Sequence, residues 1–198
     1  MRKIIVITQL SLDGVMQSPG GPEEDPRENF QYGGWAMSFG DEVIKRALDE
    51  TVSGQFDLLL GRRTYDIFAG YWPHQGDNPV TKGFDRAVKY VITHRPDELG
   101  WQTARAVGGD IVQGVRELKA SDGPELHIWG SHEVLQPMIG AGLIDEYRLW
   151  TAPVVLGQGK RLFEPGVPAG SLTLVEAASS PTGVMLNTYR PAGPVKTV

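Results

Sequence analysis

The chain has 198 residues, of which 40% are hydrophobic and 22% charged, with a formal net charge of −5 and no cysteine. This size and composition predict one globular domain over residues 1–198, and the negative charge excludes the basic excess of a general nucleic-acid-binding protein. The lack of cysteine excludes disulfides and thiolate metal sites and suits a reducing compartment, so we expect a cytoplasmic protein.

The first predicted element is a central strand over residues 4–7, where four β-branched residues follow one another. The strand leads into a turn that contains Asp13 and Gly14. A glycine at this point allows the backbone to approach a ligand closely. Two interpretations stay open here, a simple Asp-Gly turn pair or one wall of a site.

A long irregular stretch follows over residues 16–39, where prolines and glycines exclude a regular element. Its aromatic residues, among them Phe30 and Trp35, indicate packing rather than disorder. We expect a lid or wall over a site, with Trp35 as a candidate substrate contact. The alternatives are a loop packed on its own side chains or an interface with another protein.

The next predicted element is an amphipathic helix over residues 41–53, with apolar side chains on one face. Asp41 stands at its start and is favoured there as an N-cap.

A strand–turn–helix unit over residues 58–68 contains three leucines followed by Gly61, Arg62 and a second arginine. Thr64 is predicted to cap the helix. A helix N-terminus beside two arginines suits a phosphate group, since free amides and guanidinium groups both bind its oxygens. The alternative is a solvated turn with ordinary surface arginines.

A third strand is predicted over residues 89–93, and it ends at His94-Arg95-Pro96 because proline cannot continue regular pairing. A short strand over 101–107 and a helix over 110–119 come next. A further strand over 125–129 leads into a helix that Gly130 and Ser131 open, which predicts a second phosphate site of the helix-terminus type.

Pro137 lies inside that helix and is expected to kink or shorten it. The chain then forms a strand over 147–152 and a turn that contains Lys160 and Arg161. Charged residues in a Gly-x-Gly-Lys turn are usually solvated, which is the alternative to binding a substrate phosphate. A closing hairpin is predicted over 172–178 and 184–189.

The order of these motifs resembles the dihydrofolate reductase-like family, and most closely the riboflavin biosynthesis reductases, which form the C-terminal domain of the bifunctional deaminase-reductase. The turn Gly61-Arg62-Arg63-Thr64-Tyr65 and the stretch 143–163 carry the resemblance. It implies an α/β fold with a mostly parallel sheet, helices on both faces and a C-terminal antiparallel hairpin. It also implies NADPH as the cofactor and a homodimer.

The resemblance further implies the roles of individual residues. The nicotinamide would lie beside residues 10–15, the pyrophosphate over the helix start at Gly130-Ser131 and the 2′-phosphate near Arg62. The implied cofactor contacts are Gly14, Gly61, Arg62, Thr64, Thr93, His94, Arg95, Gly130, Ser131 and His132. Asp13 or Asp41 would donate the proton, and Trp35, Lys160 and Arg161 would contact the substrate.

The implied activity is hydride transfer to a small heterocyclic or ribosylamino substrate, as in 5-amino-6-(5-phosphoribosylamino)uracil reductase. A pterin or folate reductase is one alternative, and a nucleotide-binding module without turnover is another. The histidines lack the spacing of a metal site, since His132-Glu133 has no second histidine one turn later. No apolar run approaches membrane-spanning length, so we expect neither a metal nor a membrane partner.

Overall fold

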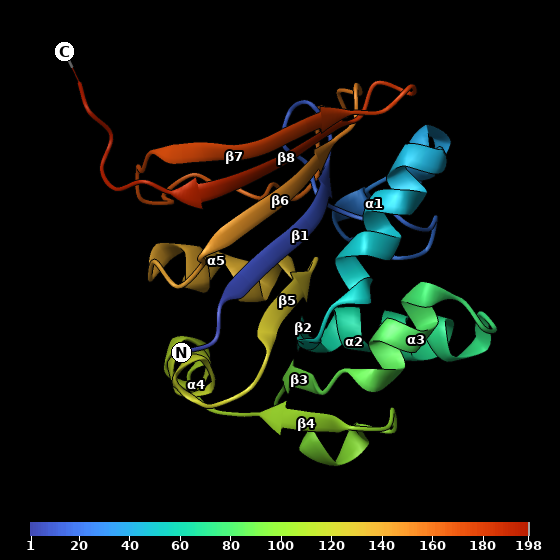
Figure 1. Ribbon diagram of the computed structural model, residues 1–198, viewed down its shortest axis with the longest axis vertical. Helices are drawn as coiled ribbons and strands as arrows, with labels where there is room; N and C mark the ends of the chain where they lie inside the picture. The colour runs from blue at the N-terminus through green and yellow to red at the C-terminus, as the bar shows by residue number, and fades with distance from the viewer. Residues whose placement is uncertain (198) are drawn as a thin grey trace.

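The computed structural model describes residues 1–197 and contains one eight-stranded sheet in the order β4-β3-β2-β5-β1-β6-β8-β7 (Figure 1). The strands are β1 (Ile4–Leu10), β2 (Phe56–Gly61), β3 (Lys89–Ile92), β4 (Ala104–Val107), β5 (Glu125–Trp129), β6 (Glu146–Thr151), β7 (Leu172–Ser179) and β8 (Met185–Pro191). β1 to β6 pair in parallel, whereas β8 pairs antiparallel with both β6 and β7. The predicted α/β fold with a C-terminal hairpin is therefore confirmed.

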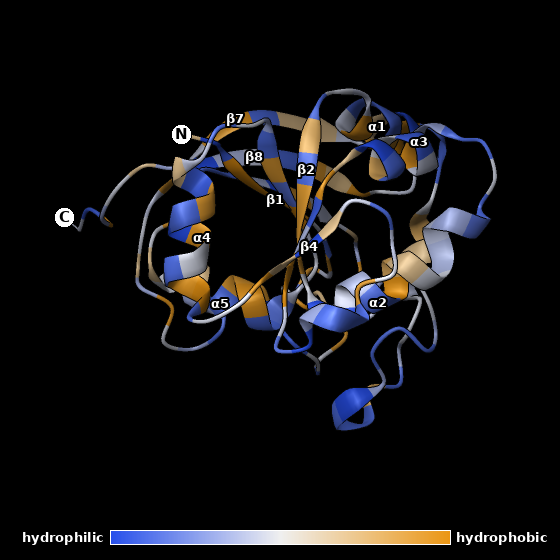
Figure 2. Ribbon diagram, turned by 90° about the horizontal axis from the view of Figure 1, so that it is seen from below, coloured by the Kyte–Doolittle hydropathy of each residue, from blue (hydrophilic) through white to orange (hydrophobic). Residues whose placement is uncertain are grey.

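Helices cover both faces of the sheet. They are α1 (Glu42–Ser53), α2 (Arg62–Tyr71), α3 (Pro79–Arg86), α4 (Ile111–Ala120) and α5 (His132–Gly140). α4 and α5 lie on one face, and α1 and α3 lie on the other (Figure 2). Among these helices, none that the structure describes has the length and apolar composition needed to cross a membrane.

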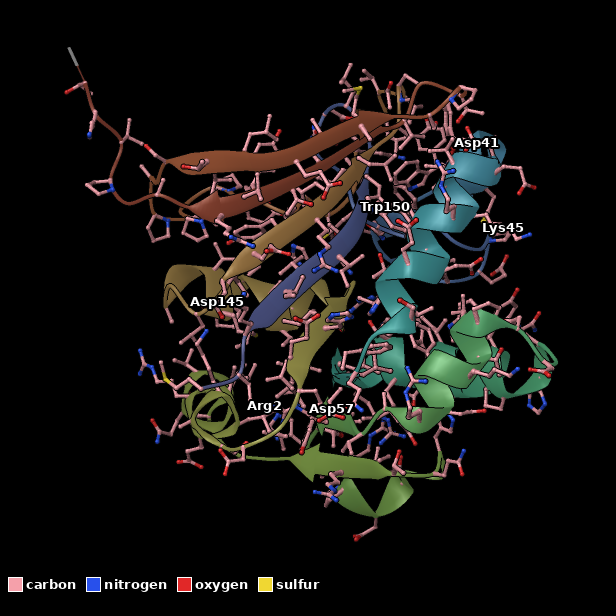
Figure 3. All side chains as sticks on the ribbon, viewed as in Figure 1. Arg2, Asp41, Lys45, Asp57, Asp145 and Trp150 are labelled. Carbon is pink, nitrogen blue, oxygen red and sulfur yellow. The ribbon has the colours of Figure 1, made fainter. Side chains whose placement is uncertain are left out.

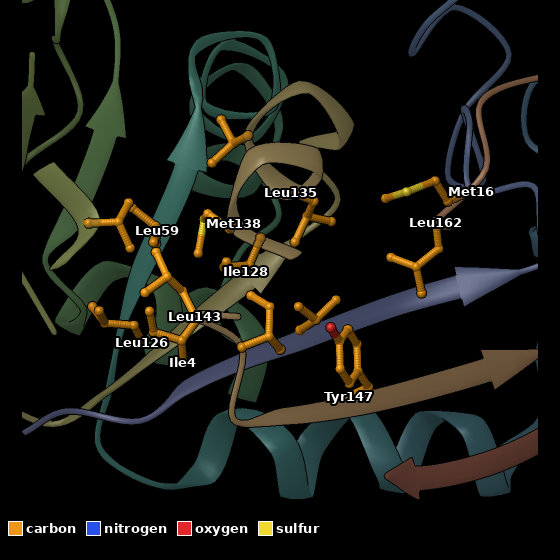
Figure 4. Close-up of a cluster of buried hydrophobic side chains, with 14 of the residues drawn as sticks. Ile4, Met16, Leu59, Leu126, Ile128, Leu135, Met138, Leu143, Tyr147 and Leu162 are labelled. Carbon is orange, nitrogen blue, oxygen red and sulfur yellow. The ribbon is translucent and has the colours of Figure 1, made fainter. Parts of the chain in front are cut away.

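The main core lies between the sheet and the helices α4 and α5 (Figure 4). It contains Ile4 and Val6 of β1, Ile128 of β5, and Leu135 and Met138 of α5, and all five are fully buried. β1 is buried on both faces because it runs through the middle of the sheet, as its β-branched sequence predicts.

Several details differ from the predictions, among them the end of β1, which continues beyond Ile7 to Leu10. The fourth strand begins at Ala104 rather than at Trp101, because Trp101 packs into the core beside Tyr65 and its amide donates to the Tyr65 hydroxyl over 2.8 Å. Pro137 does not shorten α5, which continues to Gly140. Proline removes one backbone hydrogen bond, and the buried side chains of Leu135 and Met138 hold this helix on the sheet.

Candidate functional site

A cavity of about 1300 Å³ opens at the carboxyl ends of the parallel strands. Trp150 and the first turn of α1, with Asp41 and Lys45, lie toward this end of the sheet (Figure 3). The buried Arg2–Asp57 ion pair lies at the opposite end, where it ties the start of the chain to β2. Carboxyl ends of parallel strands are the usual place for a ligand in an open α/β sheet.

The cavity has two chemically different ends. The polar end consists of residues 61–64, 93–95 and 130–133, which follow the ends of β2, β3 and β5. The apolar end lies between α1 and the sheet, and its walls are Ile7, Ala36, Ile44, Leu48, Trp150 and Ala152. Residues 16–25 and Arg27 line the cavity as well, so the irregular loop forms one of its walls.

Ser131 joins two helix N-termini at the polar end. Its hydroxyl oxygen accepts the Gly61 amide over 2.8 Å and donates to the Thr64 hydroxyl over 2.9 Å. β2 and β5 are neighbours in the sheet, so the helices that follow them, α2 and α5, start side by side. The sequence predicted two separate phosphate-binding turns, and the structure brings them together into one surface.

Steric constraints explain why glycine occupies these two turns. A Cβ atom on Gly61 would lie 3.0 Å from the Val134 side chain and 3.4 Å from Ser131. Gly130 has a φ of +65°, a left-handed conformation that favours glycine. Ser131 adopts the same conformation at φ +65°, which is unusual for a non-glycine residue. The short link between β5 and α5 is therefore strained, and the Ser131 hydrogen bonds hold it.

The predicted capping roles need correction. α2 begins at Arg62, so Thr64 lies inside the first turn and does not cap the helix. Ser131 does occupy the N-cap position of α5, but its hydroxyl makes no bond to that helix. The hydroxyl reaches across to α2 instead, because the neighbouring strand brings the Gly61 amide within range.

Arg62 and Arg95 form the rim of the polar end. Arg62 pairs with Asp66 over 2.8 Å and with Glu98 over 3.0 Å, and Arg95 pairs with the same Glu98 over 2.9 Å. The pKa of Arg62 is raised, chiefly by its hydrogen bond to Asp66. The two guanidinium groups, predicted separately, thus converge on one carboxylate, where an anion could replace it.

The other predicted polar residues lie nearby. The buried Thr93 hydroxyl accepts the Arg95 amide over 3.0 Å, which fixes the turn after β3, and His94 is exposed on the same rim. His132, the first residue of α5, lies 3.2 Å from the carboxylate of Glu164. Its other ring nitrogen is buried without a partner among the described residues.

Sequence reasoning missed an ionic cluster around Asp25, in the wall formed by the long loop. Asp25 binds Arg27 over 2.7 and 2.9 Å, Lys160 over 2.9 Å and Arg63 over 3.4 Å. Burial by itself raises the pKa of Asp25, but the hydrogen bonds from Arg27 and Lys160 outweigh it and hold the pKa well below its usual range. Arg27 also reaches Glu133 of α5 over 2.7 Å. We call these five residues the Asp25 cluster.

The Asp25 cluster changes the prediction for Lys160. This lysine is buried beside the cavity, as a substrate contact requires, but its ammonium group is already paired with a buried carboxylate. The pair links residues 135 positions apart in the chain. No pattern in the sequence near either residue predicts such a contact.

Asp41 lies in the cavity wall, yet both of its oxygens are occupied. One accepts the amides of Val43 and Ile44, each over 2.9 Å, and the other accepts the hydroxyl and amide of Thr182. The Ile44 amide is the main cause that lowers the pKa of Asp41 to about 2. The geometry is that of a helix N-cap, the alternative that the sequence favoured, and an ionised carboxylate has no proton to donate.

Asp13, Gly14 and Arg161 lie outside the cavity lining. Asp13 accepts the amides of Leu156 and Gly157 and pairs with Arg161 over 3.3 Å. Burial by itself raises the pKa of Asp13, but hydrogen bonds from Ser11 and these amides lower it to about 2. These residues therefore fasten the turn after β1 to the segment after β6, with Gly14 in a left-handed conformation at φ +82°.

Trp35 also lies outside the lining, although its neighbour Ala36 belongs to it. Its ring is buried in the hydrophobic cluster beneath α1, and its indole nitrogen donates to the Gln17 carbonyl over 2.9 Å. Trp35 thus anchors the long loop rather than facing the cavity.

The profile of the RibD C-terminal domain family matches residues 2–186. The chain belongs to this family. A curated relative, YyaP of Bacillus subtilis (strain 168), is 27% identical over 192 residues, which are 95% of this chain and 94% of the relative. YwjB of the same organism is 26% identical over 167 residues, 82% of this chain and 83% of the relative.

Solved structures show the same fold. Dihydrofolate reductase from Enterococcus faecalis, complexed with NADP(H) and RAB-propyl, has a TM-score of 0.60 and 14% identity, with 96% of each chain covered. A deaminase and 5-amino-6-(5-phosphoribosylamino)uracil reductase from Thermotoga maritima has a TM-score of 0.62 and 14% identity, and covers 96% of this chain and 57% of that one. The chain, a member of the RibD C-terminal domain family, thus has a dihydrofolate reductase-like fold.

Proposed function

We propose that this protein is an NADPH-dependent reductase that transfers a hydride to a small heterocyclic or ribosylamino substrate. The observation that carries the proposal is the paired helix starts that Ser131 joins, with Arg62 and Arg95 at their rim. Two helix N-termini offer free amides and positive dipole ends to a pyrophosphate. Family membership supports the reductase class.

The residues at the polar end fit this cofactor. Gly61 and Gly130 keep the turns free of side chains, so a pyrophosphate can approach the backbone. Arg62 and Arg95 suit a 2′-phosphate, because guanidinium groups bind phosphate oxygens two at a time. When bound, NADPH supplies a hydride to the carbon of a C=O or C=N bond, and a proton from water completes the reduction at oxygen or nitrogen.

The apolar end suits the reacting ring. Its walls exclude water around the substrate, while the opening of the cavity lets solvent deliver a proton. A pterin reductase of the folate type is less well supported, since Asp41, the carboxylate of α1 in the lining, is occupied as a helix cap. Steady consumption of NADPH with a carbonyl or imine substrate separates the reductase from a module that only binds nucleotides.

Titration with NADPH and with NADH, followed by tryptophan fluorescence, tests the cofactor. The wild type is expected to bind NADPH more tightly than NADH. The Arg62→Ala variant should bind NADPH about 10- to 100-fold more weakly, since one charged hydrogen bond contributes roughly 1.5–3 kcal/mol, and should bind NADH unchanged. Arg116→Ala, an exposed position on α4, is the control. Equal loss of both cofactors in Arg62→Ala would refute the role of Arg62.

A growth test addresses the specific substrate. Expression of this chain in a riboflavin auxotroph that lacks the reductase should restore growth if it reduces 5-amino-6-(5-phosphoribosylamino)uracil. Failure to restore growth, with the protein expressed and NADPH binding intact, would leave the reductase proposal standing and remove this substrate.

A further inference from the structure

The side chain of Gln9 is a neutral polar group in the cavity wall beside the apolar end. Ile5, Ile7 and Gln9 are alternate residues of β1, so their side chains project from the same face of the sheet. Those of Ile5 and Ile7 pack into the hydrophobic cluster beneath α1. Gln9 is half-buried. Its backbone carbonyl accepts the Thr8 hydroxyl over 3.3 Å. Its carboxamide, which offers both a donor and an acceptor, has no hydrogen-bond partner within residues 1–197.

Trp150 lies directly beside Gln9. The two residues are register partners on the neighbouring parallel strands β1 and β6, so both side chains project toward α1. The indole of Trp150 is buried in the apolar cluster and also lines the cavity. Ile44 and Leu48 of α1 form further walls. A flat ring packed on Trp150 would therefore present one of its edges to Gln9.

We propose that the apolar end binds a flat, uncharged heterocycle with an amide edge, a ring C=O beside a ring N–H, and that Gln9 is the specificity-determining residue that pairs with this edge. The inference rests on the proposed function, because the ring lies where a hydride acceptor must lie. The donor and acceptor of the carboxamide match an amide edge in both directions, and an apolar surrounding strengthens such a pair.

The charges of the lining argue against a phosphate on this substrate. The cations of the lining are Arg27, Lys45, Arg62, Arg63, Arg95 and Lys160. Its carboxylates are Glu23, Glu24, Asp25, Asp41, Asp110 and Glu133. The formal charges of the whole lining therefore cancel, and Arg62 and Arg95 are assigned to the cofactor, so a phosphate on the substrate would depend on the remaining cations being free of carboxylate partners.

The ion pairs that these cations form also argue against a phosphate on the substrate. Arg27, Arg63 and Lys160 share Asp25, while Arg62 and Arg95 share Glu98 at the opposite, cofactor-binding rim. Lys45 makes no ion pair in the described part of the chain, and it is an exposed residue of α1. Each cation of the Asp25 cluster therefore already has a carboxylate partner, which a phosphate on the substrate would have to displace.

Lumazine and naphthalene are two probes of the same two-ring size, and only lumazine has amide edges. Quenching of tryptophan fluorescence in the presence of saturating NADPH gives their affinities. Gln9→Leu is expected to weaken lumazine about tenfold and to leave naphthalene and NADPH within twofold. Gln113→Leu on α4, outside the cavity, is the matched control.

Three results would overturn the assignment. They are equal lumazine affinity in wild type and Gln9→Leu, equal loss of both probes in Gln9→Leu, and no binding of lumazine by a wild type that binds NADPH. A protein that fails to bind NADPH but binds lumazine with the Gln9 dependence would refute the proposed function and leave the ring site standing.

The claim that the substrate carries no phosphate is tested with ribose 5-phosphate as a competitor of lumazine. The wild type should show no competition, and Asp25→Asn should show it, since this change releases Arg63 and Lys160. Glu28→Gln, which removes an exposed carboxylate of the same loop outside the cavity lining, is the control. Competition in the wild type, lost in Lys160→Met or Lys45→Met, would overturn this claim. A folded Asp25→Asn protein without any competition would also contradict it.

Discussion

The polar and apolar ends of the cavity are built in different ways. The polar end consists of backbone turns, each made by a few consecutive residues between a strand and a helix, at Gly61 and at Gly130-Ser131. The apolar end has no such local unit. It combines Ile7 of β1, Trp150 of β6 and Ile44 of α1, which meet because the sheet and α1 pack on each other. The polar end therefore depends on local backbone geometry, whereas the apolar end depends on how distant segments pack together.

This difference separates two chemical tasks. Backbone amides and arginines at the polar end can hold charged groups without a large desolvation penalty, since the rim is solvated. Apolar walls favour a neutral ring and exclude water from it. The Asp25 cluster lies in the loop wall and ties that wall to α2 through Arg63 and to α5 through Arg27 and Glu133. Changes confined to one end should therefore leave binding at the other end intact.

The largest effect is expected from Gly61→Val, which adds a branched side chain where a Cβ alone would lie 3.0 Å from Val134. Forcing the helix starts apart should lower the free energy of unfolding by about 1–3 kcal/mol and abolish measurable NADPH binding. Urea denaturation and fluorescence titration measure the two effects. Lumazine should still bind, because the apolar end is untouched.

Gly70→Val is the control for that variant, since a Cβ on Gly70 has no atom within 4 Å. Loss of both lumazine and NADPH binding in folded Gly61→Val protein would show that the two ends form one unit. It would contradict the claim that changes at one end leave binding at the other intact.

A smaller effect concerns acid stability. The pKa of Asp25 is held below its ordinary value of 3.8 by Arg27 and Lys160, although burial opposes this shift. A carboxylate with a lowered folded-state pKa contributes stability above its unfolded pKa and loses it as the pH falls toward the folded pKa. The wild type should therefore exceed Asp25→Asn in unfolding free energy at pH 7, and the difference should shrink below pH 3.8.

Urea denaturation of both proteins between neutral pH and the acid limit measures this difference. Glu23→Gln, an exposed carboxylate of the same loop, should follow the wild-type curve. A constant difference between wild type and Asp25→Asn at every pH would contradict the role of the ion pairs.

The two ends also differ in how far the sequence predicts them. Gly61, Arg62, Gly130 and Ser131 were predicted from local patterns, because strand ends, glycines and helix starts are properties of a few consecutive residues. Asp41 was recognised as an N-cap for the same reason. The bond by which Ser131 joins the two helix starts was not predicted, because it depends on the pairing of β2 with β5.

The missed residues depend on contacts between distant segments. Asp25 and Lys160 are 135 positions apart, and nothing near either residue indicates the other. Gln9 could have been found from the sequence, because it is a polar residue at the spacing of Ile5 and Ile7, which lie on a buried face of β1. The predicted strand over residues 4–7 ended before it. The sequence leaves two interpretations of Asp13 open, an Asp-Gly turn pair or one wall of a site, because its partners Leu156 and Gly157 lie beyond any local pattern.

The smallest effect is expected at the rim of the polar end, from Glu98→Gln. Glu98 pairs with both Arg62 and Arg95, so an incoming 2′-phosphate must displace it. Exposed ion pairs of this kind contribute about 0.2–1 kcal/mol, and releasing the arginines should therefore raise NADPH affinity about two- to fivefold. NADH and lumazine affinities should not change, since neither ligand has a 2′-phosphate. Glu117→Gln on α4 is the control, and a fall in NADPH affinity in Glu98→Gln would mean that Glu98 orients the arginines for the cofactor instead of competing with it.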